Sequence, residues 1–138
     1  MNFDEIGGNL PALFAAAMVA VLFIQSGLDK VFDRKGNLEW LTGHFSKTPL
    51  ASLVPALLAV ITIMELASGF LAAVGIVYFL FSSSTVIIFW SSVAAAASLL
   101  SLFFGQRLAK DYPGAAVIVP YFILTGLLIF ITNPFTRP

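Results

Sequence analysis

The sequence contains no cysteine and has few charged residues. Charged residues make up 10% of its 138 residues, whereas an average soluble domain has about 25%. The absence of cysteine excludes disulfides, iron–sulfur ligation and a thiol relay carried by this chain. Since His44 is the single histidine, the chain can hold neither a bis-histidine haem nor a metal on several histidines. Seven basic residues are balanced by seven acidic ones, which disfavours a nucleic-acid partner.

The sequence consists mostly of long apolar runs. Hydrophobic residues make up 59% of the chain and the mean hydropathy is +0.99. Crossing the hydrocarbon core takes about 20 apolar residues, and runs that are apolar all round favour helices over barrel strands. The sequence therefore predicts an all-α membrane protein, a four-transmembrane-helix bundle forming one domain over 1–138. The expected helices are about 10–29, 52–79, 84–105 and 114–132, with a loop at about 30–51 and a break near 80–84.

Basic residues concentrate in two of the predicted loops. Only Arg137 lies on the other side of the predicted bundle, and the positive-inside rule therefore predicts cytoplasmic basic loops with both termini outside. Asp4 and Glu5 near the start are unlike the positive region of a signal peptide, so we expect the first helix to be retained. We expect an integral protein of a bacterial inner membrane. The basic loop residues are Lys30, Arg34, Lys35, Lys47, Arg107 and Lys110.

The first loop is longer than a tight connection needs, and two interpretations are open. One is a helix on the membrane surface, and the other is an irregular loop with Trp40 as an interfacial anchor. In the first interpretation Leu38, Trp40, Leu41 and Phe45 face the membrane, and Glu39, His44 and Lys47 face water.

Small residues form a helical stripe in the third predicted helix. Such stripes permit close helix approach and predict a packing face, as does Gly69 in the second helix. Pro120, inside the fourth helix, either kinks that helix or is absorbed by neighbouring packing. The stripe, with spacings of 3, 4, 3 and 4, is Ser91, Ala94, Ser98, Ser101 and Gly105.

Glu65 is the residue with the clearest chemical potential. It lies about 13 residues into the second helix, roughly 20 Å along its axis and so near the membrane midplane. A carboxylate is expensive there and should face the bundle, either protonated or paired. It then either handles a proton or ligand, or forms a structural hydrogen bond that locks helices together. Candidate partners at similar depth are Thr62, Ser68, Ser91, Tyr121 and Thr125.

Lys30 and Gln25 lie at the end of the first helix. We expect the Lys30 side chain to snorkel to the headgroups as an anchor, reaching only part of the way inward. Both residues, with Glu65, Tyr121 and Thr125, are candidates for ligand binding or proton handling. The sequence indicates no catalytic residue and no metal site.

Two short motifs resemble the DoxX-like family of small four-helix integral membrane proteins. Members carry a glycine and a lysine at the end of the first helix, then a glutamate–leucine pair followed by spaced glycines in the second. The resemblance covers residues 21–77, and the last glycine, Gly75, is displaced from the usual form. The matching segments are Gly27-Leu28-Asp29-Lys30 and Glu65-Leu66-Ala67-Ser68-Gly69-Phe70-Leu71.

The resemblance implies a subunit of a quinone-linked or respiratory oxidoreductase complex, because some relatives have that role. It also implies that Lys30 and Glu65 matter together. The chain offers no cofactor ligands of its own, so we expect redox chemistry to need partner subunits, with a quinone or lipid as the possible ligand. Two other functions remain open: an assembly factor for a membrane complex, and a proton-coupled transporter using Glu65.

Overall fold

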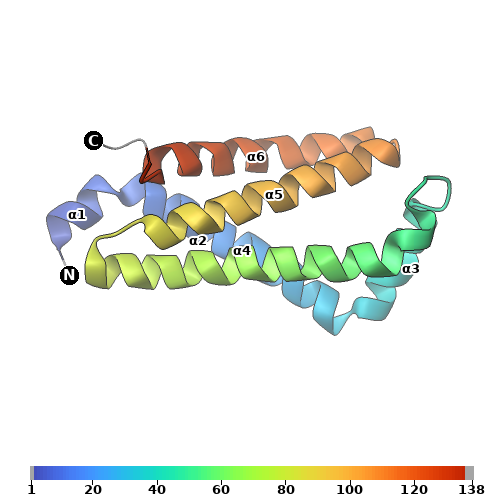
Figure 1. Ribbon diagram of the computed structural model, residues 1–138, viewed down its shortest axis with the longest axis horizontal. Helices are drawn as coiled ribbons and strands as arrows, with labels where there is room; N and C mark the ends of the chain where they lie inside the picture. Colours follow the sequence, from blue (N-terminus) through green and yellow to red (C-terminus); the bar gives the residue numbers. More distant parts are fainter. Residues whose placement is uncertain (1, 136–138) are drawn as a thin grey trace.

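The computed structural model describes residues 2–135, and every regular secondary-structure element in that part is a helix. Four of its helices are long and apolar enough to cross a membrane, and they pack as a bundle (Figure 1). The predicted fold is therefore confirmed, and the chain is a small four-helix integral membrane protein. The elements are α1 (Phe3–Gly8), α2 (Leu10–Phe32), α3 (Arg34–His44), η1 (Ala51–Leu53), α4 (Val54–Ser82), α5 (Val86–Leu108) and α6 (Tyr112–Thr132).

The helix ends differ from the predicted ones by up to three residues. The break between α4 and α5 falls at 83–85, where Ser83 adopts a left-handed conformation with φ of 58° and ends α4. Helix α6 continues through Pro120. The short helix α1 was not predicted. Its cap is local, because the Asn2 side chain accepts hydrogen bonds from the backbone N–H groups of Asp4 and Glu5.

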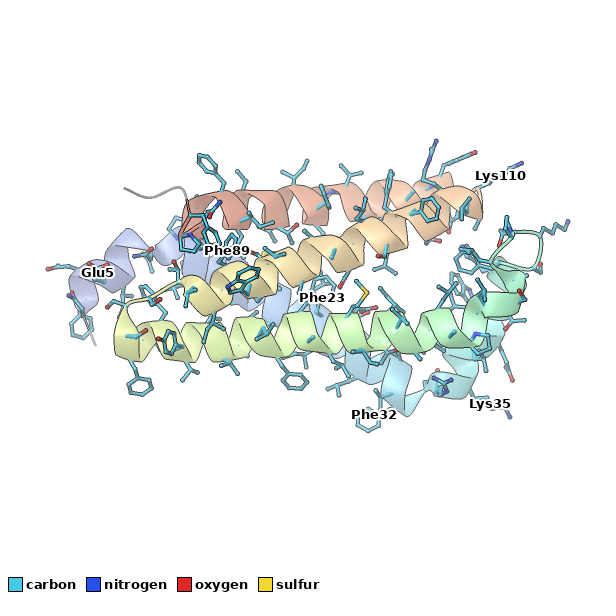
Figure 2. All side chains as sticks on the ribbon, viewed as in Figure 1. Glu5, Phe23, Phe32, Lys35, Phe89 and Lys110 are labelled. Atoms are coloured by element: carbon cyan, nitrogen blue, oxygen red, sulfur yellow. The ribbon has the colours of Figure 1, made fainter. Side chains whose placement is uncertain are left out.

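Both ends of the described chain lie at one end of the bundle. Helix α1 and the end of α6 lie together there, and α3 lies at the opposite end (Figure 1). Lys35 and Lys110 are at the α3 end, and Glu5 is at the other (Figure 2). This arrangement is what an even number of crossings requires. Arg137, which entered the orientation argument, lies outside the described residues.

Two glycine contacts bring α2 and α4 into close approach in one antiparallel register. A Cβ added to Gly69 would lie 2.7 Å from the backbone nitrogen of Ile24, and one added to Gly27 would meet the Leu66 side chain at 2.6 Å. Absence of a side chain lets the two backbones approach closely, as is common between membrane helices. The predicted packing role of Gly69 is thus explained by a direct backbone contact.

Helix α2 ends before α4 does at the α3 end of the bundle. Continued in the same register, Phe32 at the end of α2 falls opposite Ile61, about two turns inside α4. Phe32 accordingly lies short of the end marked by Lys35 and Lys110 (Figure 2). Helix α3 packs against the first turns of α4 beyond that point. The start of α4 is thus covered by a short helix instead of by a full transmembrane partner.

The other helices pack mainly in chain order. Helix α4 packs against α5 and α5 against α6, with a smaller contact between α2 and α6. Helix α6 is the least covered, with 17% of its most apolar window buried, compared with 44% for α2. The core is built from small and large apolar side chains of all four long helices, including Ala16, Phe23, Ala72, Ala95 and Leu128.

Most, but not all, of the predicted small-residue stripe is packed. Ser91, Ser98 and Gly105 are buried and Ala94 is half-buried. Ser101 is exposed, so its predicted place in the packing face is wrong. The reason is the early end of α2, because of which Ser101 borders a cavity lined by α3 and α4 and does not pack against a helix.

Candidate functional site

An ion pair joins α2 to α4 in the interior of the bundle. The ammonium nitrogen of Lys30 lies 3.0 Å from Oε1 of Glu65. Glu65 is 1% exposed, and the Lys30 side chain is 16% exposed. The expectation that Lys30 snorkels to the headgroups is therefore wrong. Because α2 ends early, Lys30 near its C-terminus lies at the level of the middle of α4, within reach of Glu65.

The pair explains how a carboxylate is accommodated in an apolar helix. Apart from the ion pair, Oε1 of Glu65 has no hydrogen-bond partner among residues 2–135. An isolated buried charge is very unfavourable, whereas an opposite charge in contact offsets much of the desolvation. Ser26, one turn before Lys30, accepts a hydrogen bond from the ammonium group at 2.9 Å. Glu65 therefore faces the bundle, as predicted, and its partner is a cation.

A cavity of about 450 Å³ lies beside this pair, bounded by α3, α4 and α5. It occupies the region that α2 leaves uncovered. Lys30 is the charged side chain that lines it, and the remaining walls are mostly apolar. They include Trp40, Leu41 and Phe45 from α3 and its cap, Leu57, Leu58, Ile61 and Met64 from α4, and Leu102 and Phe104 from α5.

Helix α3 forms the outer wall of the cavity. Of the two interpretations of the first loop, the helix is the one observed, over Arg34–His44. Its apolar residues do not all face the membrane as that interpretation expected, because Leu41 and Phe45 line the cavity. Phe45 also covers Gly105, where an added Cβ would lie 3.3 Å from its ring.

His44 attaches α3 to the junction of α5 and α6. Its Nε2–H donates to Oε1 of Gln106 at 2.7 Å, and the same nitrogen lies 3.7 Å from Oδ2 of Asp111. Its ring stacks on Trp40, with centroids 4.4 Å apart. The expectation that His44 faces water is therefore wrong, since its side chain is 15% exposed. The histidine holds the wall of the cavity in place.

The other predicted site residues do not join the pair. Gln25 lies on an exposed part of α2, and Tyr121 is half-buried on α6. Thr125 is buried and donates to the carbonyl of Phe122. Ser68 donates to the carbonyl of Met64 and lies 3.5 Å from Ser98 across the α4–α5 contact. Within residues 2–135, none of these four has a hydrogen bond to Lys30 or Glu65.

The cavity and the His44 attachment were not predicted. Gln106, at the end of an apolar stretch, was a signal, but nothing local in the sequence places it beside His44. Among residues 2–135 there is no group of three or more histidine, aspartate and glutamate side chains that could hold a metal ion. Comparison with family models, with curated proteins and with solved structures finds no match.

Proposed function

We propose that this chain is a small accessory subunit of a quinone-linked or respiratory membrane oxidoreductase complex. The observation that carries the proposal is the ion pair between Lys30 and Glu65 at 3.0 Å. These are the two polar positions of the DoxX-like resemblance, which lie on different helices and 35 residues apart in the sequence. Their direct contact supports a joint role of the kind that the resemblance implies.

Chemistry also favours a functional pair over a purely structural one. Replacing a buried ion pair by apolar residues of similar volume is often neutral or stabilising, so stability alone is a weak reason for such a pair. Ionisable groups inside membranes commonly mark ligand or proton sites. The cavity beside Lys30 offers room for a ligand at that place. The pair and the cavity together support a site at which a membrane-soluble substrate of the complex is held.

An assembly factor is the second candidate function, favoured by the outer face of α6. Ile123, Leu127 and Phe130 there are 58%, 58% and 78% exposed. Such a face suits either lipid or the helix of another subunit. In this function Glu65 and Lys30 serve only to fix α2 against α4.

The test is purification of the native complex in a mild detergent, followed by mass spectrometry and by assay of quinone reduction. The proposal expects redox-active subunits to copurify with the chain. It also expects Glu65→Gln to lower quinone reduction in a complex that is still assembled. Recovery of the chain without redox partners contradicts the proposal. Normal activity with Glu65→Gln, combined with loss of assembly on Leu127→Ser, a polar change in the exposed face of α6, favours the assembly factor.

A separate preparation, proteoliposomes of the isolated chain, tests the transporter function. The charge of Glu65 is balanced by Lys30. A transporter that uses Glu65 to carry protons would therefore have to break this ion pair during each transport cycle. Flux that disappears with Glu65→Gln favours a transporter and contradicts the accessory-subunit proposal.

A further inference from the structure

We propose that the cavity between α3, α4 and α5 binds a small neutral amphiphile whose polar end is a carbonyl group, and that Lys30 donates a hydrogen bond to that carbonyl. A quinone ring and the ester carbonyl of a membrane lipid share this chemistry. The inference deepens the proposed function and rests on it for the choice of a quinone as the first probe.

The ammonium group of Lys30 has one donor to spare. It carries three hydrogens and no acceptor. Its contacts are with Oγ of Ser26 at 2.9 Å and Oε1 of Glu65 at 3.0 Å. Lys30 also lines the cavity, and its side chain keeps 16% exposure. The remaining hydrogen is therefore available to an acceptor inside the cavity.

Three other polar side chains of the wall make hydrogen bonds within the protein. The Asn37 amide donates to the carbonyl of Asp33 at 2.8 Å, and the Ser101 hydroxyl donates to the carbonyl of Ala97 at 2.9 Å. The carbonyl oxygen of Gln106 accepts from His44. Lys30 is the charged donor among the lining residues, and a hydrogen bond from a charged group is stronger than one from a neutral group.

The charge balance selects a neutral ligand. The ammonium of Lys30 is already compensated by the carboxylate of Glu65. An anionic headgroup would add an uncompensated charge next to that carboxylate in an apolar region, and a cationic one would be repelled by Lys30. A purely hydrocarbon ligand would leave the third ammonium hydrogen unpaired, which is unfavourable away from water. A carbonyl on an otherwise apolar molecule meets all three conditions.

Size and access agree with a ligand that arrives through the bilayer. A volume of about 450 Å³ falls within the range of about 300–1,000 Å³ that small-molecule sites have. Leu57, Val60 and Phe104 line the cavity and are 38%, 53% and 60% exposed. These exposed apolar walls, from α4 and α5, suit a ligand that arrives through the acyl chains.

Trp40 provides the readout. It lines the cavity, whereas the second tryptophan, Trp90, lies 11 residues before Ser101 on α5, roughly 16 Å away along the helix axis. The full chain with Trp90→Phe, reconstituted in nanodiscs, is titrated with a ubiquinone analogue bearing a ten-carbon tail. Quinones quench tryptophan, and the proposal expects saturable quenching of Trp40. The chain with Trp40→Phe measures unsaturable quenching of Trp90 by quinone dissolved in the lipid.

Two variants test the assignment to Lys30 and to the cavity. Lys30→Met should weaken binding about tenfold or more, as expected for loss of a hydrogen bond from a charged donor. Lys35→Met, which removes an exposed lysine outside the cavity, should leave binding unchanged. Ser101→Phe fills the cavity while keeping the ion pair, and should abolish saturable quenching even if Lys30→Met does not fold.

A separate experiment tests whether a membrane lipid occupies the cavity. Mass spectrometry of lipid extracted from the purified chain should show a retained ester lipid that is lost with Ser101→Phe, if lipid rather than quinone occupies the cavity. Either ligand, lost in that variant, supports the proposal. Unsaturable quenching together with lipid retention that Ser101→Phe does not change overturns it. Since these measurements use the isolated chain, they can fail while redox subunits still copurify with it, and the two proposals are thus tested separately.

Discussion

Lys30 extends from the last turn of α2 to contact Glu65 in the middle of α4, with the two charged atoms 3.0 Å apart. The contact is possible because α2 stops about two turns short of the start of α4. The same early stop leaves the space that becomes the cavity and that α3 covers. One feature of helix length thus accounts for both the buried pair and the ligand-sized space beside it.

The first prediction concerns the stability of the pair. Lys30→Met leaves Glu65 buried without its cation and should lower the free energy of unfolding by about 3–5 kcal/mol. The double variant Lys30→Met with Glu65→Leu removes both charges and should recover most of that loss. Unfolding in mixed detergent micelles, followed by circular dichroism, measures the difference.

Lys35→Met is the matched control for this measurement, because Lys35 is exposed on α3. It should change the free energy of unfolding by less than about 0.5 kcal/mol. A double variant as unstable as Lys30→Met alone would show that the two residues do not act as a compensating pair.

The second prediction concerns the close approach of α2 and α4. Gly69→Ala places a Cβ 2.7 Å from the backbone nitrogen of Ile24, so the helices must separate. We expect a loss of about 1–3 kcal/mol in the free energy of unfolding. Gly126→Ala is the control, since nothing lies within 4 Å of its added Cβ, and it should be neutral or slightly stabilising. Equal effects of the two changes would contradict the register described.

The third prediction separates two serines on one helix. Ser98 is fully buried against α4, whereas Ser101 is exposed at the cavity. Ser98→Leu should therefore lower the thermal midpoint of the purified protein by several degrees or prevent folding. Ser101→Leu should leave the midpoint close to that of the parent while reducing the cavity. Similar destabilisation by both changes would show that Ser101 does belong to the packing face, as its spacing predicted.

The fourth prediction concerns orientation. The positive-inside rule places the basic end of the bundle, with α3, in the cytoplasm. The chain has no cysteine, so a single introduced cysteine reports its own position. Ser83→Cys should react with a membrane-impermeant maleimide in intact cells, and Lys47→Cys should react only after the membrane is opened. The reverse pattern would reject the predicted orientation.

The sequence predicts the helices far better than it predicts the site. Apolar length and the need to satisfy backbone groups in lipid determine four spans, and only their ends shift, by up to three residues. The partner of Glu65 was missed because Lys30 was assigned to the interface from its place at the end of an apolar run. Its true depth depends on the α2–α4 register, which is set by Gly27 and Gly69 against Leu66 and Ile24 and not by local hydropathy.

The cavity was missed for a related reason. Ser101 and Gly105 belong to a regular stripe of small residues, and spacing alone assigns the whole stripe to helix packing. Whether another helix packs against a particular residue of the stripe depends on where α2 ends and where α3 lies against α4 and α5. His44 shows the same limit, because its contact with Gln106 joins residues 62 positions apart in the sequence.

The ion pair between Lys30 and Glu65 can be measured in a lipid bilayer. Solid-state NMR of the reconstituted chain, labelled with ¹⁵N at lysine Nζ and ¹³C at glutamate Cδ, measures dipolar dephasing between the two groups. We expect dephasing from a direct contact, which should disappear with Lys30→Met and persist with Lys35→Met. Absence of that dephasing, with the Lys30 ammonium instead in contact with lipid phosphate, would contradict the paired carboxylate and the functions proposed from it.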